Sequence, residues 1–206
     1  MDIRIDMDKM VDFLVQLLNA PSPTGDTARA MAVVKDAFKP FPFPMDLTPK
    51  GILVGTWRGQ QHNAPRALTA HVDTLGAMVS EIKSNGRLRV SQLGGWEWAS
   101  VEGEGVTIFA ASGQTYRGSF LPTTASIHAH SRKERGATKD DKNMEVRIDA
   151  QTTSRKETRR LGIQVGDFIA FDPRVETNDA GFIRSRHLDD KACIATIFGA
   201  LDALHS

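Results

Sequence analysis

The chain has 206 residues, of which 40% are apolar and 25% are charged, as is typical of a soluble globular protein. Its 26 basic and 25 acidic side chains leave a formal net charge of +1, which argues against nucleic acid or an anionic membrane as the partner. The acidic N-terminus does not match a signal peptide, and no apolar run is long enough to span a bilayer. The single cysteine, Cys193, excludes an intrachain disulfide and favours a cytoplasmic protein.

Residues 1–75 follow the pattern of the start of an α/β domain. Apolar residues at helical spacing predict a helix over residues 7–19, with Asp6 as its N-cap. Pro21 ends this helix, because the residue before a proline is pushed out of the helical conformation. A second helix is expected after a turn at residues 21–25.

Three strands are expected next. Residues 45–48 and 52–57 flank a Lys-Gly turn and predict a hairpin. An apolar run then ends in His71 and Asp73, and we interpret residues 68–71 as a buried central strand. Because sites in open α/β sheets form at the carboxyl ends of the strands, His71 and Asp73 are candidate site residues.

The pattern changes in residues 76–175, where short alternating apolar runs are separated by turn residues. The Asn85-Gly86 pair between two such runs is a strong hairpin signal. Trp96 and Trp98 either cover an open end of this region or form an exposed surface for a partner. Several short strands with regular turns predict a small β-barrel or sandwich. They are expected at residues 78–82, 88–90, 106–110, 115–120, 144–148 and 165–171.

The α/β pattern resumes near the end of the chain. Residues 182–186 predict a strand, and residues 191–204, rich in Ala and Gly, predict a helix that packs closely on a sheet. We therefore expect one α/β domain, formed by residues 1–75 and 176–206, that is interrupted by an inserted β domain at residues 76–175.

Asp189 and Asp190 follow the predicted strand at residues 182–186. A hydrolytic pair of metal ions lies about 3.5–4 Å apart and needs a carboxylate that bridges them, and Asp189 suits that task. His71 suits a terminal ligand, because neutral imidazole is a good donor to zinc or cobalt. Asp73 would hold the His71 imidazole in the required tautomer.

Each of these residues also has a simpler interpretation. A His-Val-Asp sequence at a strand end is usually a surface or capping feature, and Asp189 with Asp190 is by itself a helix N-cap pair. The two motifs together, on either side of an insertion, favour metal binding more than either motif alone. Cys193 is expected to be a small buried side chain, and His128 and His130 to be exposed rather than a chelating pair.

Four motifs, at residues 21–25, 70–76, 165–167 and 186–191, occur in the order found in one known family. On these motifs the chain resembles the tetrahedral aminopeptidases, also called glutamyl aminopeptidases, and in particular the branch associated with synthesis of the N-acetylglutaminylglutamine amide osmoprotectant. The resemblance implies a metallopeptidase-type α/β sandwich domain with an inserted β-barrel dimerisation domain. It also implies two divalent metal ions, zinc or cobalt, short peptide substrates, and homodimers that assemble into a hollow dodecamer.

The resemblance assigns His71 as a ligand of one metal, Asp189 as the bridging ligand and Asp73 as the support for His71. The family's other ligands and its Glu-Glu pair, which includes the general base, follow the helix after the Asp-Asp motif, and no Glu-Glu pair occurs in this sequence. We therefore expect the N-terminal portion of a metallo-aminopeptidase, inactive by itself because the general base is missing. Two alternatives stay open, namely an oligomerisation module without catalysis and a related metal-dependent deacylase.

Overall fold

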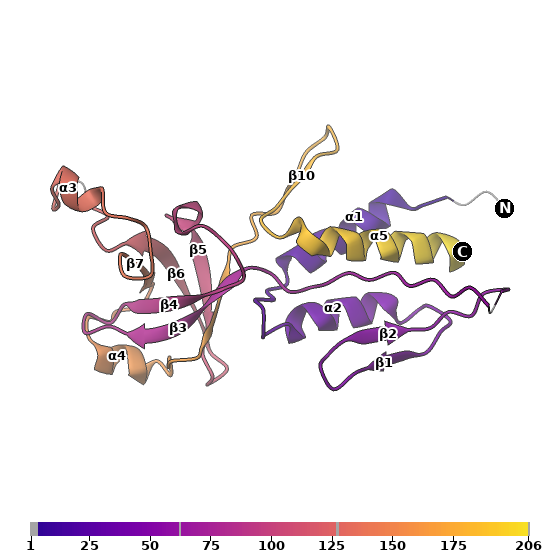
Figure 1. Ribbon diagram of the computed structural model, residues 1–206, viewed down its shortest axis with the longest axis horizontal. Coiled ribbons are helices and arrows are strands. Elements are labelled where there is room, and N and C mark those ends of the chain that lie inside the picture. Colours follow the sequence, from indigo (N-terminus) through magenta and orange to yellow (C-terminus); the bar gives the residue numbers. More distant parts are fainter. Residues whose placement is uncertain (1–3, 62, 127, 206) are drawn as a thin grey trace. The chain divides into compact units, whose positions relative to one another are not determined.

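The structure is a computed structural model that describes residues 4–61, 63–126 and 128–205 (Figure 1). The chain divides into two compact units. The first, here called the α/β unit, contains the described residues up to Ala20, the segment Ala28–Val72 and the residues from Leu188 onward. The second, the barrel unit, contains Pro21–Thr27 and Asp73–His187. Each unit is therefore assembled from segments that are distant in the sequence.

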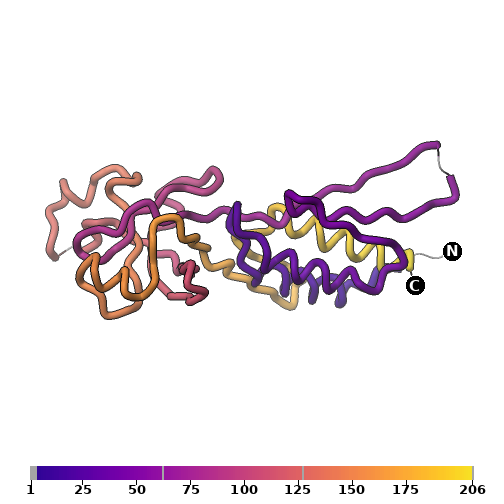
Figure 2. Tube along the Cα trace, turned by 90° about the horizontal axis from the view of Figure 1, so that it is seen from below, coloured from indigo at the N-terminus to yellow at the C-terminus, as the bar shows by residue number. Residues whose placement is uncertain are grey.

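Three helices form most of the α/β unit: α1 (Met7–Asn19), α2 (Ala28–Phe38) and α5 (Leu188–His205). The predicted first helix and its N-cap are confirmed, since the Asp6 carboxylate accepts the backbone N–H of Lys9 at 3.0 Å. The helix predicted over residues 191–204 is confirmed as part of α5. α1 and α5 run side by side (Figure 1, Figure 2), and an ion pair of 2.5 Å joins Lys9 to Asp202.

Aromatic rings fill the core between these helices. The centroids of Phe13 and Phe198 lie 4.6 Å apart, and those of Phe38 and Phe198 lie 5.9 Å apart. Such ring pairs contribute about 0.5–1.5 kcal/mol beyond the apolar area that they bury. Beside the helices, β1 (Met45–Leu47) and β2 (Leu53–Gly55) pair antiparallel, so the predicted hairpin is confirmed.

Two predicted strands differ from the structure. Residues 68–71 are not a strand: they form irregular chain in which the Leu68 side chain is 71% exposed. Among the residues described, no strand pairs with this segment, and an extended chain becomes a strand only through hydrogen bonds to a neighbour. The strand expected at residues 182–186 is reduced to β10 (Ile183–Arg184), which pairs only with β9 (Glu176–Thr177) in a small hairpin.

The barrel unit is a closed antiparallel barrel in the order β3-β4-β7-β6-β5-β8. Full closure satisfies the backbone hydrogen bonds at both edges of the sheet, so the barrel has no open edge. The mixed α/β fold with a β-barrel, expected from the sequence, is therefore confirmed. The strands are β3 (Gly76–Ile82), β4 (Leu88–Leu93), β5 (Gly105–Phe109), β6 (Thr115–Pro122), β7 (Met144–Ile148) and β8 (Phe168–Phe171). The short helices are η1 (Trp98–Val101), α3 (Arg132–Arg135) and α4 (Arg155–Arg160).

Alternating side chains of these strands fill the barrel. Val79, Leu88, Ile108 and Phe120 are at most 1% exposed and belong to one continuous core. A burial of this kind contributes about 1.5–3 kcal/mol for each large side chain. The carboxylate of Glu145 is also buried, and it forms ion pairs with Lys83 and Arg87. This pairing explains how an acidic residue is accommodated in β7, because a buried charge is tolerated when it has partners.

Trp96 packs against the barrel core and does not form an exposed surface. Its ring lies edge-on to Phe120 and Phe171, with centroids 5.9 and 5.3 Å away, and Trp98 packs beside it at 4.9 Å. The indole N–H donates to the carbonyl of Gly76 at 2.9 Å. The two tryptophans therefore cover the barrel core, which was one of the two interpretations of this motif. In the described part of the chain, no helix has the length and hydropathy needed to cross a membrane.

Candidate functional site

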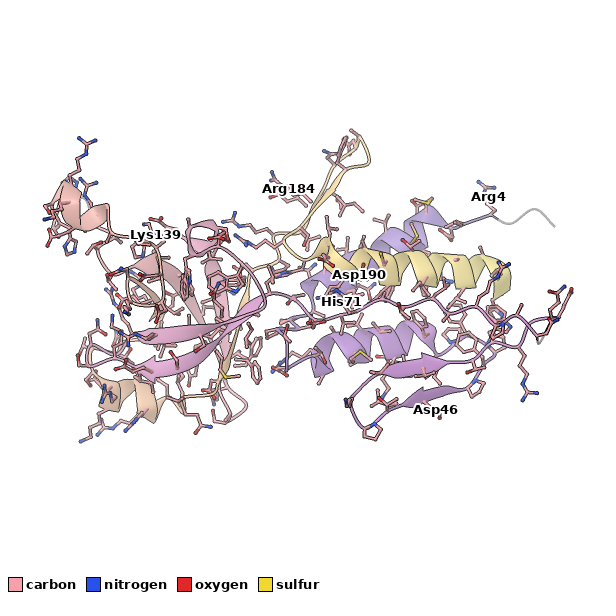
Figure 3. The ribbon with its side chains drawn as sticks, viewed as in Figure 1. Arg4, Asp46, His71, Lys139, Arg184 and Asp190 are labelled. Atoms are coloured by element: carbon pink, nitrogen blue, oxygen red, sulfur yellow. The ribbon has the colours of Figure 1, made fainter. Side chains whose placement is uncertain are left out.

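The α/β unit brings His71 and Asp189 together. The His71 Nε2 atom lies 3.3 Å from the Asp189 Oδ1 atom, and His71 sits beside the first turn of α5 (Figure 3). Their side chains are 50% and 94% exposed, so both donor groups face solvent. The two residues predicted as metal donors are thus neighbours in space, although more than a hundred residues separate them in the sequence.

The backbone at the start of α5 positions the acidic pair. Asp189 and Asp190 have non-helical dihedral angles (φ −84°, ψ 109° and φ −121°, ψ 27°), and the peptide bond between them is cis. Both residues therefore precede the regular part of the helix. A carboxylate at a helix N-terminus interacts favourably with the helix dipole.

Lys191 follows this pair and is fully buried, with 0% of its surface exposed. Its ammonium group donates to the carbonyl oxygens of Leu17 at 2.9 Å and Ala20 at 2.7 Å, at the C-terminal end of α1. Burial lowers the pKa of Lys191 from 10.5 to about 8. Lys191 therefore ties the start of α5, and with it Asp189, to the end of α1. The sequence analysis missed this role, and the only signal was a lysine placed among small apolar residues.

Asp73 belongs to the barrel unit, where its Oδ2 atom accepts a hydrogen bond from the Thr24 hydroxyl at 2.8 Å. The carboxylate is half-buried. This contact involves the Pro-Ser-Pro-Thr-Gly segment at residues 21–25, which the sequence analysis predicted as a turn and included among the family motifs.

The residues before Leu188 are held by the barrel unit. Arg186 donates to the Ser100 carbonyl at 2.5 Å, and its guanidinium lies 3.1 Å from the buried carboxylate of Glu104. His187 is 6% exposed, and its Nε2 atom lies 3.4 Å from the Phe171 carbonyl oxygen. These contacts hold Arg186 and His187 against the barrel unit.

Other candidate donors do not add to the pair. Within residues 4–61, 63–126 and 128–205, no group of three or more His, Cys, Asp or Glu side chains is arranged to hold a metal ion. His128 is exposed, as predicted. Cys193 is exposed, so the expectation that it is buried is wrong. A hydrogen bond to Asp190 raises the pKa of the Cys193 thiol, with smaller contributions from burial and from the charges of Asp190 and Asp189.

The donor set fits a divalent cation. Two ligands at a tetrahedral angle, with metal–donor bonds of about 2.0–2.2 Å, lie about 3.3–3.5 Å from each other. The Nε2–Oδ1 separation of 3.3 Å falls in this range, and imidazole nitrogen with carboxylate oxygen is a common combination for zinc and cobalt. The same distance also suits an ion pair between a carboxylate and a protonated imidazole.

Comparison with known proteins agrees with the arrangement of these motifs. The chain is 44% identical over 190 residues to the putative aminopeptidase YhfE of Bacillus subtilis (strain 168). The aligned stretch covers 92% of this chain and 54% of that protein. An aminopeptidase from the archaeon Desulfurococcus kamchatkensis has the same fold, with a TM-score of 0.83, 22% identity, and coverage of 95% of this chain and 52% of that one. The TET1 peptidase of Pyrococcus horikoshii also matches, with a TM-score of 0.79 and 20% identity. The match covers 95% of this chain and 56% of that one, and that peptidase can assemble into a tetrahedron or a large octahedral shell.

The chain thus spans about half the length of the relatives that it matches. The sequence profile of the M42 glutamyl aminopeptidases matches residues 51–206, a stretch that includes His71, Asp73 and Asp189. We conclude that the chain belongs to the M42 glutamyl aminopeptidase family.

Proposed function

We propose that this chain is the N-terminal portion of a metal-dependent aminopeptidase that removes N-terminal residues from short peptides. The observation that carries the proposal is the 3.3 Å approach of His71 to Asp189 in a chain of the M42 family. In this proposal His71 would be a ligand of one metal ion, and the Asp189 carboxylate would be the ligand shared by two. Asp73, two residues further along the chain, is the candidate support for the His71 imidazole in this proposal.

When bound, such a pair of ions polarises the scissile carbonyl and lowers the pKa of the attacking water. The general base and the remaining ligands would be contributed by the part of the relatives that this chain does not span. Zinc and cobalt are the metals that best suit an imidazole and carboxylate pair. We also propose a cytoplasmic protein, since the exposed thiol of Cys193 suits a reducing compartment.

The test is hydrolysis of aminoacyl anilides by the chain extended with the portion that its relatives have, together with its metal content. We expect metal-dependent turnover by the extended protein and none by the 206-residue chain. His71→Ala and Asp189→Asn should each lower turnover by more than about 100-fold, because even residues that only support a ligand are worth about 10–100-fold. His128→Ala, which removes another exposed imidazole, is the matched control and should leave turnover unchanged. Turnover that persists without metal, or in both site variants, would refute the proposal.

We further propose that residues 76–175 form an inserted domain through which two copies of the chain dimerise, as a step towards a dodecamer. The tetrahedral and octahedral assemblies of the Pyrococcus horikoshii peptidase support this proposal. Light scattering after size-exclusion chromatography should give a dimer or larger for the chain and a monomer once residues 77–175 are removed. A monomeric intact chain at micromolar concentration would count against it.

A deacylase of related architecture remains the alternative activity. An aminopeptidase requires a free amino group on its substrate, whereas a deacylase acts on an acylated one. A panel of matched substrates with free and N-acetylated termini separates them, and cleavage of the acetylated members alone would favour the deacylase.

A further inference from the structure

Lys191 is the first buried residue of α5, and the function proposed above gives it no task. Asp189 and Asp190, just before it, keep contact with solvent, whereas Lys191 is 0% exposed. Lysine is rarely placed at such a position, because its ammonium group loses its hydration there. In the part of the chain that the structure describes, no carboxylate pairs with this group. An apolar side chain of similar length would fill the same space without that cost, so the charge itself requires an explanation.

The explanation lies at the C-terminal end of α1. The Lys191 ammonium group donates to the carbonyl oxygens of Leu17 at 2.9 Å and of Ala20, the C-cap residue, at 2.7 Å. The last carbonyls of a helix have no partner within it and bear the negative end of the helix dipole. α1 has no basic residue in its own last turn. Lys191 therefore supplies from α5 the cation that α1 lacks, and hydrogen bonds from a charged donor are the stronger kind.

Lysine side chains tie α1 to α5 at both ends of this antiparallel pair (Figure 1). Lys9 pairs with Asp202 at one end, where the two side chains are 53% and 17% exposed, and an ion pair open to solvent contributes little. Lys191 forms the tie at the other end, the end of α5 that carries Asp189. Because Asp189 and Asp190 have non-helical dihedral angles, the regular geometry of the helix does not fix them. Their placement therefore depends on the anchor that follows them.

We propose that Lys191 is a positioning residue of the metal site. Its ammonium group fixes the first turn of α5 to the end of α1, and this keeps the Asp189 carboxylate 3.3 Å from the His71 imidazole, where the two can share a divalent cation. All of these groups belong to the α/β unit. The inference rests on the proposed function, since it takes His71 and Asp189 as ligands.

The test is NMR of the 206-residue chain with two readouts. Relaxation of the ¹⁵N nuclei in the backbone amides of Asp189 and Asp190 reports how firmly this turn is held. Titration with Zn²⁺, followed at the His71 imidazole, gives the affinity of the site even where binding is weak. Lys191→Met keeps the aliphatic stem and removes the donors, and Lys191→Arg retains charge and donors. Lys9→Met is the matched control, because it removes the lysine that joins the same two helices at the other end.

We expect Lys191→Met to lower the order parameters of the Asp189 and Asp190 amides from about 0.85, the value of rigid backbone, towards about 0.6. Zn²⁺ binding at His71 should weaken about 3- to 10-fold, somewhat less than the 10–100-fold typical of a residue that contacts the ligand directly. Lys9→Met should leave both readouts unchanged, and Lys191→Arg should keep most of the wild-type affinity. The loss of affinity should persist even where urea unfolding shows Lys191→Met to be no less stable than Lys9→Met, which a merely structural role would not produce.

The inference is overturned if Lys191→Met leaves the amides as rigid and the affinity as high as in the wild type. It is also overturned if Lys9→Met weakens binding as much as Lys191→Met, or if Lys191→Arg binds no better than Lys191→Met. Should Lys191→Met fail to fold, as seen in its amide spectrum, Lys191→Gln compared with Lys9→Gln gives the same contrast.

A further variant, Asp189→Asn, separates this inference from the proposed function. If Asp189→Asn weakens Zn²⁺ binding at His71 and Lys191→Met does not, the inference about Lys191 fails alone. If Asp189→Asn leaves Zn²⁺ binding at His71 unchanged, the metal site itself is refuted, and the inference about Lys191 falls with it.

Discussion

The buried ammonium group of Lys191 makes the stability of the chain depend on pH in a direction that can be derived. Burial lowers the pKa of this group from 10.5 in the unfolded chain to about 8 in the folded one. Between these values the unfolded state binds more protons than the folded state, so the free energy of unfolding rises with pH. Below about pH 8 both states are protonated, and the folded state bears the full cost of burying the charge.

The size of the effect follows from the same two values. The pKa of Lys191 falls from 10.5 to about 8 on folding. At about 1.36 kcal/mol for each pKa unit, burial of the charged form lowers the free energy of unfolding by about 3 kcal/mol. Between about pH 7 and about pH 9.5 the linkage relation gives about 2 kcal/mol of that total. The neutral amine still donates to the carbonyls of Leu17 and Ala20, so these hydrogen bonds survive deprotonation.

Lys191→Met removes the titrating group and keeps the aliphatic stem. Urea unfolding of the reduced chain, followed by circular dichroism between about pH 7 and about pH 9.5, gives the free energy of unfolding of both proteins. The wild type should gain about 2 kcal/mol relative to Lys191→Met as the pH rises. Lys191→Ala should show the same pH-dependent difference with a lower stability throughout, because it also loses the packing of the stem. A difference between wild type and Lys191→Met that does not change with pH would refute the reasoning.

Three further predictions concern stability and thiol reactivity. Gly76→Ala should lower the free energy of unfolding by about 1–3 kcal/mol because of overpacking, whereas Gly95→Ala, whose added Cβ meets no atom within 4 Å, should change little in the same assay. Glu145→Gln should destabilise the chain by about 2 kcal/mol through its weakened ion pairs, and an unchanged denaturation midpoint would contradict the role given to the buried carboxylate. Asp190→Asn should lower the pKa of the Cys193 thiol and speed its reaction with a disulfide reagent at about pH 7 several-fold, and an unaltered rate would exclude the hydrogen bond as the cause of the raised pKa.

Several elements of the fold could be predicted from the sequence because their signals are local. The spacing of apolar residues and the cap at Asp6 located α1. The Asn85-Gly86 pair located the turn between β3 and β4, which pair antiparallel around it. Helical periodicity and turn chemistry involve residues only a few positions apart, so the chain specifies them before any tertiary contact forms. The order of the motifs was also sufficient to indicate the family.

Other features depend on partners that the sequence does not reveal. Residues 68–71 have the composition of a strand but no neighbouring strand among the residues described, and the hydrogen bonds that define a strand come from a neighbour. The burial of Lys191, the exposure of Cys193 and the bond from Thr24 to Asp73 likewise arise from contacts between distant segments. The sequence alone thus determined which residues were candidates for the site. Only the tertiary structure decided that His71 and Asp189 meet, because their proximity is a consequence of how the helices and the irregular segment between them pack.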